Sequence, residues 1–249
     1  MSLQKDLSLA NRLISALPTN ERGLLLQHSE LVELELHTVL IEADQSPDHA
    51  YFPVDGFVAV VLRVEDTADV EVGLVGHEGM FTPSLVLGVS LSSFTYRVQG
   101  AGRAFKIHRS RLQQLLAEGA CLRNVLNRYI DVRASHLAQQ VACMNCHTVE
   151  QRLARWLLMT RDRAHSSELF LTHEVLALML GARRESVTQA ASALQKRGLI
   201  SYSRGYVMLL DAAGLGLAAC KCYQADLMVY ERTLGDCEDG LEARASIGR

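Results

Sequence analysis

The sequence predicts an α+β fold in which a strand-rich front half leads through one long helix into a helical rear part with a β-hairpin. Three observations support this prediction. Short β-branched and aromatic runs separated by turn residues fill residues 32–107. Apolar residues then recur every three or four positions from Leu122 to Val141, with no glycine or proline among them. Two short amphipathic helices and two β runs follow one another between residues 172 and 210.

The composition is that of a chain that folds around a core. Of the 249 residues, 49% are hydrophobic and 21% are charged, which excludes disordered and collagen-like classes. No apolar run approaches the ~18–20 residues of a membrane span. The first fifteen residues carry Lys5, Asp6 and Arg12 and lack the apolar core of a signal peptide. With six cysteines and no export signal, we expect reduced thiols and a cytoplasmic protein without a membrane partner.

Charge is spread unevenly along the chain. Residues 1–146 carry 12 Lys and Arg against 16 Asp and Glu, whereas residues 147–234 carry 11 against 8. The rear part is therefore basic in a chain whose overall net charge is −3. This asymmetry favours a rear part that binds a polyanion, although ordinary solvated faces also produce differences of this size.

The front part is expected to begin with helices and to continue with strands. Residues 6–36 show apolar positions at helical spacing, interrupted by Pro18, and are predicted to form short helical pieces. From Val32 to Ile107 we expect many short strands, with turns at Val54–Gly56 and Gly76–Gly79. Strands joined by such turns are typical of a β-sandwich or barrel.

The long helix presents a continuous apolar seam. A helix of this length needs a partner along such a seam, so a coiled-coil-like homodimer is a natural interpretation. Packing against the helix's own domain is the alternative. The residues expected at the dimer interface are Leu122, Leu126, Tyr129, Ile130 and Leu137.

The stretch from Leu171 to Ile200 has the pattern of a helix-turn-helix. Thr172 is a favourable N-cap, and Gly181 stands where a left-handed residue ends the first helix. The second helix has apolar residues spaced by three and four, and Gly198 ends it. These apolar residues are Val187, Ala190, Ala191 and Leu194.

The second helix leaves polar side chains off its apolar face, where they can reach base edges in a DNA major groove. There an arginine can pair with guanine, a glutamate with cytosine and a glutamine with adenine. Two β runs around Ser203–Gly205 predict a wing with Arg204 at its tip, within reach of phosphate. A helical hairpin with a solvated polar face is the alternative. The candidate DNA-binding residues are Thr172, Arg183, Arg184, Glu185, Ser186, Thr188, Gln189, Ser192 and Arg204.

These motifs resemble those of the Crp/Fnr transcription regulators. Residues 172–188 (THEVLALMLGARRESVT) are similar to the helix-turn-helix of that family, and residues 149–158 (VEQRLARWLL) to the helix that opens its DNA-binding domain. The resemblance extends to about residue 234. It implies an N-terminal double-stranded β-helix, jelly-roll-like, that senses an effector, followed by a dimerisation helix and a C-terminal winged helix-turn-helix.

The predicted domains are a β-roll sensor (1–115), a dimerisation helix and hinge (116–147), a winged helix-turn-helix (148–234) and a flexible tail (235–249). The resemblance implies a homodimer on a pseudo-palindromic site in double-stranded DNA. RNA polymerase and a small-molecule effector of unknown identity are further candidate partners. No nucleophile elbow, phosphate-binding Gly-Lys loop or series of metal ligands favours an enzyme.

One departure from the family pattern concerns the effector. Members that bind cyclic nucleotides carry Gly-Glu and then an Arg-Ser or Arg-Thr pair on a phosphate-binding turn. Here Ser92-Ser93 stands in place of that pair, so we expect no cyclic nucleotide binding, because a buried phosphate needs a counter-charge. Arg97 and Arg103 are either rival clamps or structural residues of their strands. The candidate effector pocket consists of Gly76, Glu78, Gly79, Ser92 and Ser93.

The long helix ends in a Cys-x-x-Cys-His string formed by Cys143, Cys146 and His147. Covalent haem attachment, a thiol redox switch or metal site, and ordinary helix-end residues are the three interpretations. Cys220 and Cys222 fall in an amphipathic helix predicted from residue 215 to 234, where residues two apart make poor joint ligands. We therefore predict no cofactor and no metal. A redox- or haem-responsive DNA-binding sensor that uses the string is the alternative function.

Overall fold

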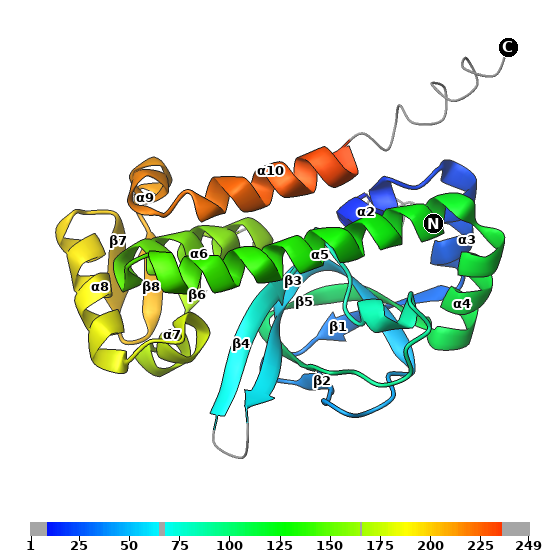
Figure 1. The fold of residues 1–249 in the computed structure, drawn as a ribbon, viewed down its shortest axis with the longest axis horizontal. Helices are drawn as coiled ribbons and strands as arrows, with labels where there is room; N and C mark the ends of the chain where they lie inside the picture. Colours follow the sequence, from blue (N-terminus) through cyan, green and yellow to red (C-terminus); the bar gives the residue numbers. More distant parts are fainter. Residues whose placement is uncertain (1–8, 65–67, 165, 236–249) are drawn as a thin grey trace, which may run out of the picture.

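The front half of the molecule is an antiparallel sheet flanked by helices (Figure 1). The computed structural model describes residues 9–64, 68–164 and 166–235. The sheet has the order β1-β5-β3-β4, and β2 also pairs with β5. Its strands are β1 Ser29–Leu34, β2 Val39–Ile41, β3 His49–Val64, β4 Ala68–Val75 and β5 Thr95–His108. The strand-rich front half predicted from the sequence is thus confirmed.

Short helices flank the sheet: α2 Arg12–Ser15, α3 Thr19–Gln27, η1 Pro83–Leu85 and α4 Arg109–Glu118. The side chain of Asn11 caps α2 by accepting from the backbone N–H groups of Leu13 and Ile14. The prediction of helices throughout residues 6–36 is wrong beyond α3, because β1 follows directly. Pairing of β1 with β5, in register Ser29↔Ile107 to Leu34↔Gly102, replaces the helical hydrogen bonds there.

The turn predicted at Val54–Gly56 is also wrong, because these residues lie inside the single strand β3. The register between β3 and β5 shifts at this point, so the feature is a bulge in a continuous strand. Gly56 makes it sterically accessible, with φ +74°. A Cβ at Gly56 would lie 2.5 Å from the carbonyl oxygen of Gly100.

The long helix is confirmed as α5 (Ala120–Cys146), and α10 (Cys222–Leu234) lies along its side (Figure 1). The interface predicted for α5 needs correction. Leu122, Leu126 and Tyr129 are buried in a cluster with residues of the sheet and of α2 to α4 in the same chain, so they cannot contact a partner. Ile130 and Leu137 stay partly exposed.

The rear part carries a helix-turn-helix and a three-stranded sheet of order β6-β8-β7. Its elements are α6 Val149–Ala164, β6 Glu168–Phe170, α7 His173–Leu180, α8 Arg184–Lys196, β7 Ile200–Ser203, β8 Tyr206–Leu209 and α9 Ala212–Ala218. The single helix predicted from residue 215 to 234 is wrong. Ala219 adopts an extended backbone, with φ −69° and ψ 155°, and separates α9 from α10. Of the tail predicted at 235–249, all but Gly235 lies outside the described residues.

The front sheet and the rear part share one apolar core. Phe57 of β3 and Leu74 of β4 belong to the same buried cluster as Trp156 of α6 and Met179 of α7. Strand β4 contacts α7 and strand β3 contacts α6. In the part of the chain that the structure describes, no helix has the length and apolar character needed to cross a bilayer.

Candidate nucleic-acid interface

Local sequence signals fix the helix-turn-helix. The Thr172 Oγ1 accepts a hydrogen bond from the N–H of Val175 at 3.2 Å, which caps α7 as predicted. Gly181 adopts φ +53° and ends α7 in the left-handed conformation. The apolar face of α8 is buried against α6 and α7, as its spacing predicts. The two helices are therefore held at a fixed relation.

The opposite face of α8 is polar and open to solvent. Of the residues predicted to bind DNA, Thr172 and Ser186 are half-buried. The exposed ones are Arg183, Arg184, Glu185, Thr188, Gln189, Ser192 and Arg204. The structure thus brings the predicted α8 residues together on one solvent-facing side of the rear part.

Two contacts hold side chains of this face against α7. The Nη1 of Arg184 donates to the Oε1 of Glu174 at 3.1 Å, with side chains 63% and 73% exposed. An ion pair this exposed contributes little to stability, so Arg184 is free to exchange Glu174 for another acceptor. The Oγ1 of Thr188 donates to the carbonyl of its own helix at Arg184 and lies 3.0 Å from the Nδ1 of His173.

His173 is a residue of this surface that the sequence analysis did not single out. Its ring stacks on Tyr202 of β7, with ring centroids 4.5 Å apart. Burial and the nearby charge of Arg184 lower the pKa of His173 below its ordinary value. The stacked pair joins α7 to the wing. Sequence reasoning missed it because the two residues lie far apart along the chain.

The wing forms as predicted. Strands β7 and β8 pair from Ile200↔Leu209 to Ser203↔Tyr206, and the tip is Arg204-Gly205. Arg204 takes a left-handed backbone with φ +51° and projects from an exposed turn. The N–H of Leu171 donates to the carbonyl of Gly205 at 2.6 Å, which ties the tip to the entrance of α7.

The predicted effector residues lie in different surroundings. Glu78 is paired with Arg163 of α6, with Nε donating to Oε1 at 2.8 Å. Burial raises the pKa of the Glu78 carboxyl, but the Arg163 charge outweighs this effect and keeps that pKa below its ordinary value.

The other predicted effector residues differ in burial and contacts. Ser92 is buried and donates to the carbonyl of Phe94 at 2.7 Å, whereas Ser93 is exposed. The backbone of Gly79 packs under Tyr129, and the N–H of Gly76 donates to the Glu78 carboxylate.

A cavity of about 490 Å³ opens between the Glu78 turn, α6 and α10. Its wall mixes cationic and anionic groups, and Tyr230 of α10 donates from its hydroxyl to the carbonyl of Glu78 at 2.6 Å. Of the five predicted effector residues this cavity takes in Glu78, and neither Ser92 nor Ser93 lines it. The effector pocket drawn from the sequence stays a prediction.

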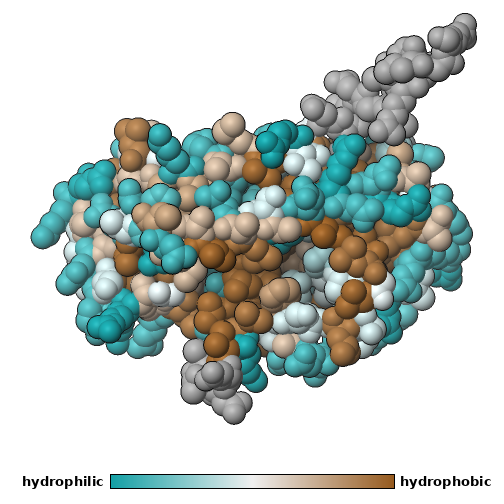
Figure 2. Space-filling view, in the orientation of Figure 1, coloured by the Kyte–Doolittle hydropathy of each residue, from teal (hydrophilic) through white to brown (hydrophobic). Residues whose placement is uncertain are grey.

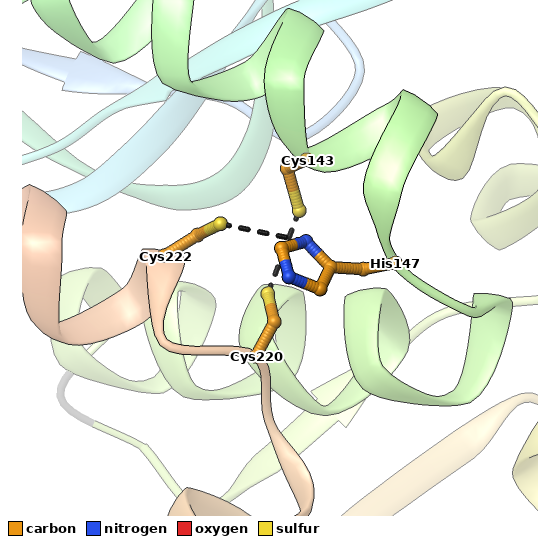
Figure 3. Close-up of side chains that lie close together, drawn as sticks. All are labelled: Cys143, His147, Cys220 and Cys222. Carbon is orange, nitrogen blue, oxygen red and sulfur yellow. Dashed lines mark hydrogen bonds between the residues drawn. The ribbon is translucent and has the colours of Figure 1, made fainter.

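Sulfur and imidazole ligands gather where α5 ends. Cys143 and His147 of the predicted string lie beside Cys220 and Cys222 (Figure 3). Cys146 is exposed and outside this group. We refer to Cys143, His147, Cys220 and Cys222 as the Cys/His cluster. Cys220 and Cys222 were expected to be poor joint ligands inside one helix, but Cys220 stands in the link before α10 and not inside a helix.

Comparison with known proteins agrees with this geometry. The family model described as a Crp-like helix-turn-helix domain matches residues 151–217, and that of the cyclic nucleotide-binding domain matches residues 31–118. The CRP-like cAMP-activated global transcriptional regulator of Mycobacterium tuberculosis is 26% identical over 192 residues, which cover 74% of this chain and 84% of that protein.

Solved structures show the same fold. The c-di-GMP responsive global regulator CLP of Xanthomonas campestris superposes with a TM-score of 0.63 at 17% identity, over 77% of this chain and 99% of that one. A Crp/Fnr family protein from Eubacterium rectale gives a TM-score of 0.62 at 18% identity, over 82% and 95% of the two chains. Both families of motifs, in the sheet and in the helix-turn-helix, are therefore accounted for by one group of regulators that are not enzymes. The chain belongs to the Crp/Fnr family and is a DNA-binding transcription regulator of that type.

Proposed function

We propose that this regulator is a homodimer that reads DNA bases with the N-terminal half of α8 and grips phosphate with the wing. The exposed polar face of α8, set on a buried apolar face, is the observation that carries the proposal. Arg184 has the fork that pairs with guanine O6 and N7, and Gln189 can pair with adenine. Arg204 is placed at the wing tip for a contact that does not depend on sequence.

The test is selection of random DNA duplexes by the full chain and by three variants. Arg184→Ala should cost ~1–3 kcal/mol on the best site and relax one base pair in each half-site. Arg204→Ala should weaken binding to all sequences alike and flatten its salt dependence. Arg197→Ala is the matched control, because Arg197 ends the same helix and is paired with Glu150 at 2.8 Å. An Arg184→Ala variant that selects the unchanged motif at full stringency would refute α8 as the reader.

The dimer is proposed to form along a seam of α5 that faces away from α10. The seam residues repeat at intervals of three and four and are exposed or half-buried: Asn127, Ile130, Ala134, Leu137, Val141 and Met144. Helix α10 occupies the other side of α5, where it contacts His136 and Gln139. Figure 2 shows apolar side chains gathered along and beneath α5, beside the strands β3 and β4. A second copy would cover this surface. The α8 helices of the two copies would then enter successive major grooves, with half-site centres one helical turn (~10–11 bp) apart.

The front sheet is proposed to respond to an effector other than a cyclic nucleotide. The two arginines that could replace the missing clamp are both engaged. Arg97 donates to Asp69 at 3.3 Å, and Arg103 donates from Nε to Asp55 at 3.1 Å. A cyclic phosphate would have to displace these carboxylates to gain a counter-charge.

We also propose that the domains end at residues 115, 147 and 234. A contact with RNA polymerase is part of the same proposal.

The alternative haem-responsive function finds no support in the string itself. Thioether attachment needs both cysteines of the string, yet Cys143 is buried at the end of α5 and faces Cys220. Cys146 faces solvent on another side of the helix. A redox function would have to use the Cys/His cluster instead of Cys143 and Cys146 together.

A further inference from the structure

The Cys/His cluster joins two segments that are distant in sequence. Cys143 and His147 come from the end of α5, Cys220 from the link after α9, and Cys222 from the first residue of α10 (Figure 3). The four ligand atoms all lie within 4.8 Å of one another. The three cysteines are at most 4% exposed, and His147 is half-buried.

Two distances in the cluster are close to those between the ligands of one tetrahedral ion. The sulfur atoms of Cys143 and Cys220 are 3.5 Å apart, and the sulfur of Cys222 lies 3.6 Å from the Nδ1 of His147. Around a tetrahedral zinc, bonds of ~2.3 Å to sulfur and ~2.0–2.1 Å to nitrogen place two sulfurs ~3.8 Å apart and sulfur and nitrogen ~3.6 Å apart. A shared ion therefore needs only small side-chain adjustments.

We propose that Cys143, His147, Cys220 and Cys222 hold one Zn²⁺ ion in a closed structural site. Three thiolates and one imidazole are a ligand set of structural zinc sites, and four protein ligands leave no position for water or substrate. On binding, the protons of the ligating thiols pass to solvent, and His147 binds as the neutral imidazole through Nδ1. The zinc keeps its oxidation state throughout.

Neighbouring residues suit such an ion. The Nε2 of Gln139 donates to the sulfur of Cys222 at 3.0 Å, the type of outer hydrogen bond that orients a metal-bound thiolate. The site with three thiolates would carry a net charge of −1. The guanidinium of Arg155, which is paired with Asp226, also interacts electrostatically with both Cys143 and Cys220.

The position of the site suggests what the ion does for the fold. The chain leaves the cluster at His147, forms the helix-turn-helix and its wing, and returns at Cys220. Zinc would close this loop and fix both of its ends to α5 and α10. It would thereby restrain the DNA-binding unit relative to the seam of α5. This inference does not depend on which residues of α8 read bases.

The first test is the metal content of the full chain, purified without chelators and measured by mass spectrometry of the elements. We expect about one zinc per chain in the wild type. Cys220→Ser and Cys222→Ser should lose most of it. Cys146→Ser is the matched control, because Cys146 lies in the same helical turn as Cys143 but outside the cluster, and it should keep its zinc. A wild type without zinc, or a Cys220→Ser variant that retains it fully, would overturn the proposal.

A second test remains informative if the serine variants fold poorly. Cys222→His keeps a ligand, so it should hold a divalent ion but change the absorption bands of the cobalt-substituted protein, which report the number of thiolates. Unchanged cobalt bands in this variant would refute Cys222 as a ligand. A Cys143–Cys220 disulfide in freshly purified protein, found by alkylation under non-reducing conditions, would overturn the zinc proposal and indicate a redox pair instead. Stoichiometric iron with visible absorption would equally overturn it.

Discussion

The indole Nε1 of Trp156 donates a hydrogen bond to the Oε1 of Glu71 at 3.1 Å, across the boundary between α6 and β4. Glu71 also accepts from the Nε2 of Gln99 of β5 at 3.3 Å. Its side chain is buried, and burial raises the pKa of the Glu71 carboxyl to about 7, against the opposing effect of these hydrogen bonds. A titratable group therefore lies between the front sheet and the DNA-binding unit.

The stability of the chain should depend on this proton. Between the unfolded pKa of 4.5 and the folded pKa of about 7, the folded chain holds a proton that the unfolded chain has released. The free energy of unfolding should therefore fall as pH rises through this range, by up to about 3 kcal/mol. Glu71→Gln removes this contribution, so the variant should gain stability relative to the wild type as pH rises.

Denaturant unfolding at pH 5, 6, 7 and 8 measures this difference. Glu118→Gln serves as the control, because Glu118 is exposed on α4. Parallel pH profiles for the wild type and Glu71→Gln would contradict the prediction.

A second prediction concerns the buried ion pair between α6 and α10. The Nη2 of Arg155 lies 2.5 Å from the Oδ2 of Asp226, with both side chains less than 10% exposed. Asp226→Ala leaves the guanidinium buried without its counter-charge and should cost about 3–5 kcal/mol of unfolding free energy. Glu231→Ala, which breaks the exposed pair of α10 with Arg12, should cost less than ~1 kcal/mol. Equal losses in the two variants would show that the buried pair contributes no more to the free energy of unfolding than the exposed pair.

The third prediction concerns the seam of α5. Leu137→Glu and Val141→Glu place charges in the proposed dimer interface and should give monomers with strongly reduced DNA affinity. Asn124→Glu is the control, because Asn124 is exposed on α5 but lies off the seam. Light scattering at micromolar concentration measures the mass in solution. A wild type that is monomeric even with DNA present would rule out this interface.

A fourth prediction concerns cyclic nucleotides. Neither cyclic AMP nor cyclic GMP at millimolar concentration should release heat in titration calorimetry or change DNA affinity, because the phosphate would lack a free counter-charge. Asp55→Asn frees Arg103 from its carboxylate partner and is the variant in which weak phosphate binding would emerge first. A micromolar dissociation constant for the wild type would refute the prediction.

Features set by neighbouring residues were predictable from the sequence. The caps at Thr172 and Gly181 and the apolar spacing of α8 act within a few residues, so the helix-turn-helix was predicted closely. The Cys/His cluster was not predictable, because Cys143 and Cys220 are separated by 77 residues and are brought together only by the tertiary fold. The extended backbone at Ala219, which splits α9 from α10, likewise has no glycine or proline to announce it.

The prediction that Leu122, Leu126 and Tyr129 lie in the dimer interface was wrong for a related reason. Periodicity shows that Leu126 and Tyr129 face something apolar, but it does not say whether that surface belongs to the same chain or to a second one. The sheet and the short helices α2 to α4 cover the side of α5 that carries Leu126 and Tyr129, which leaves the seam from Asn127 to Met144 for a partner.

The apolar cluster that Phe57 and Leu74 share with Trp156 and Met179 holds the helix-turn-helix, and with it α8, against the sheet. Swinging the helix-turn-helix away from the sheet would bring this surface into water, at about 25 cal/mol for each Å² of apolar area. A signal that re-aims α8 must supply that difference through tighter binding to the open arrangement. A ligand that binds both arrangements equally well would leave the helix-turn-helix packed on the sheet, whatever its affinity. The size of the buried contact thus sets the smallest preference that any effector of this protein must have.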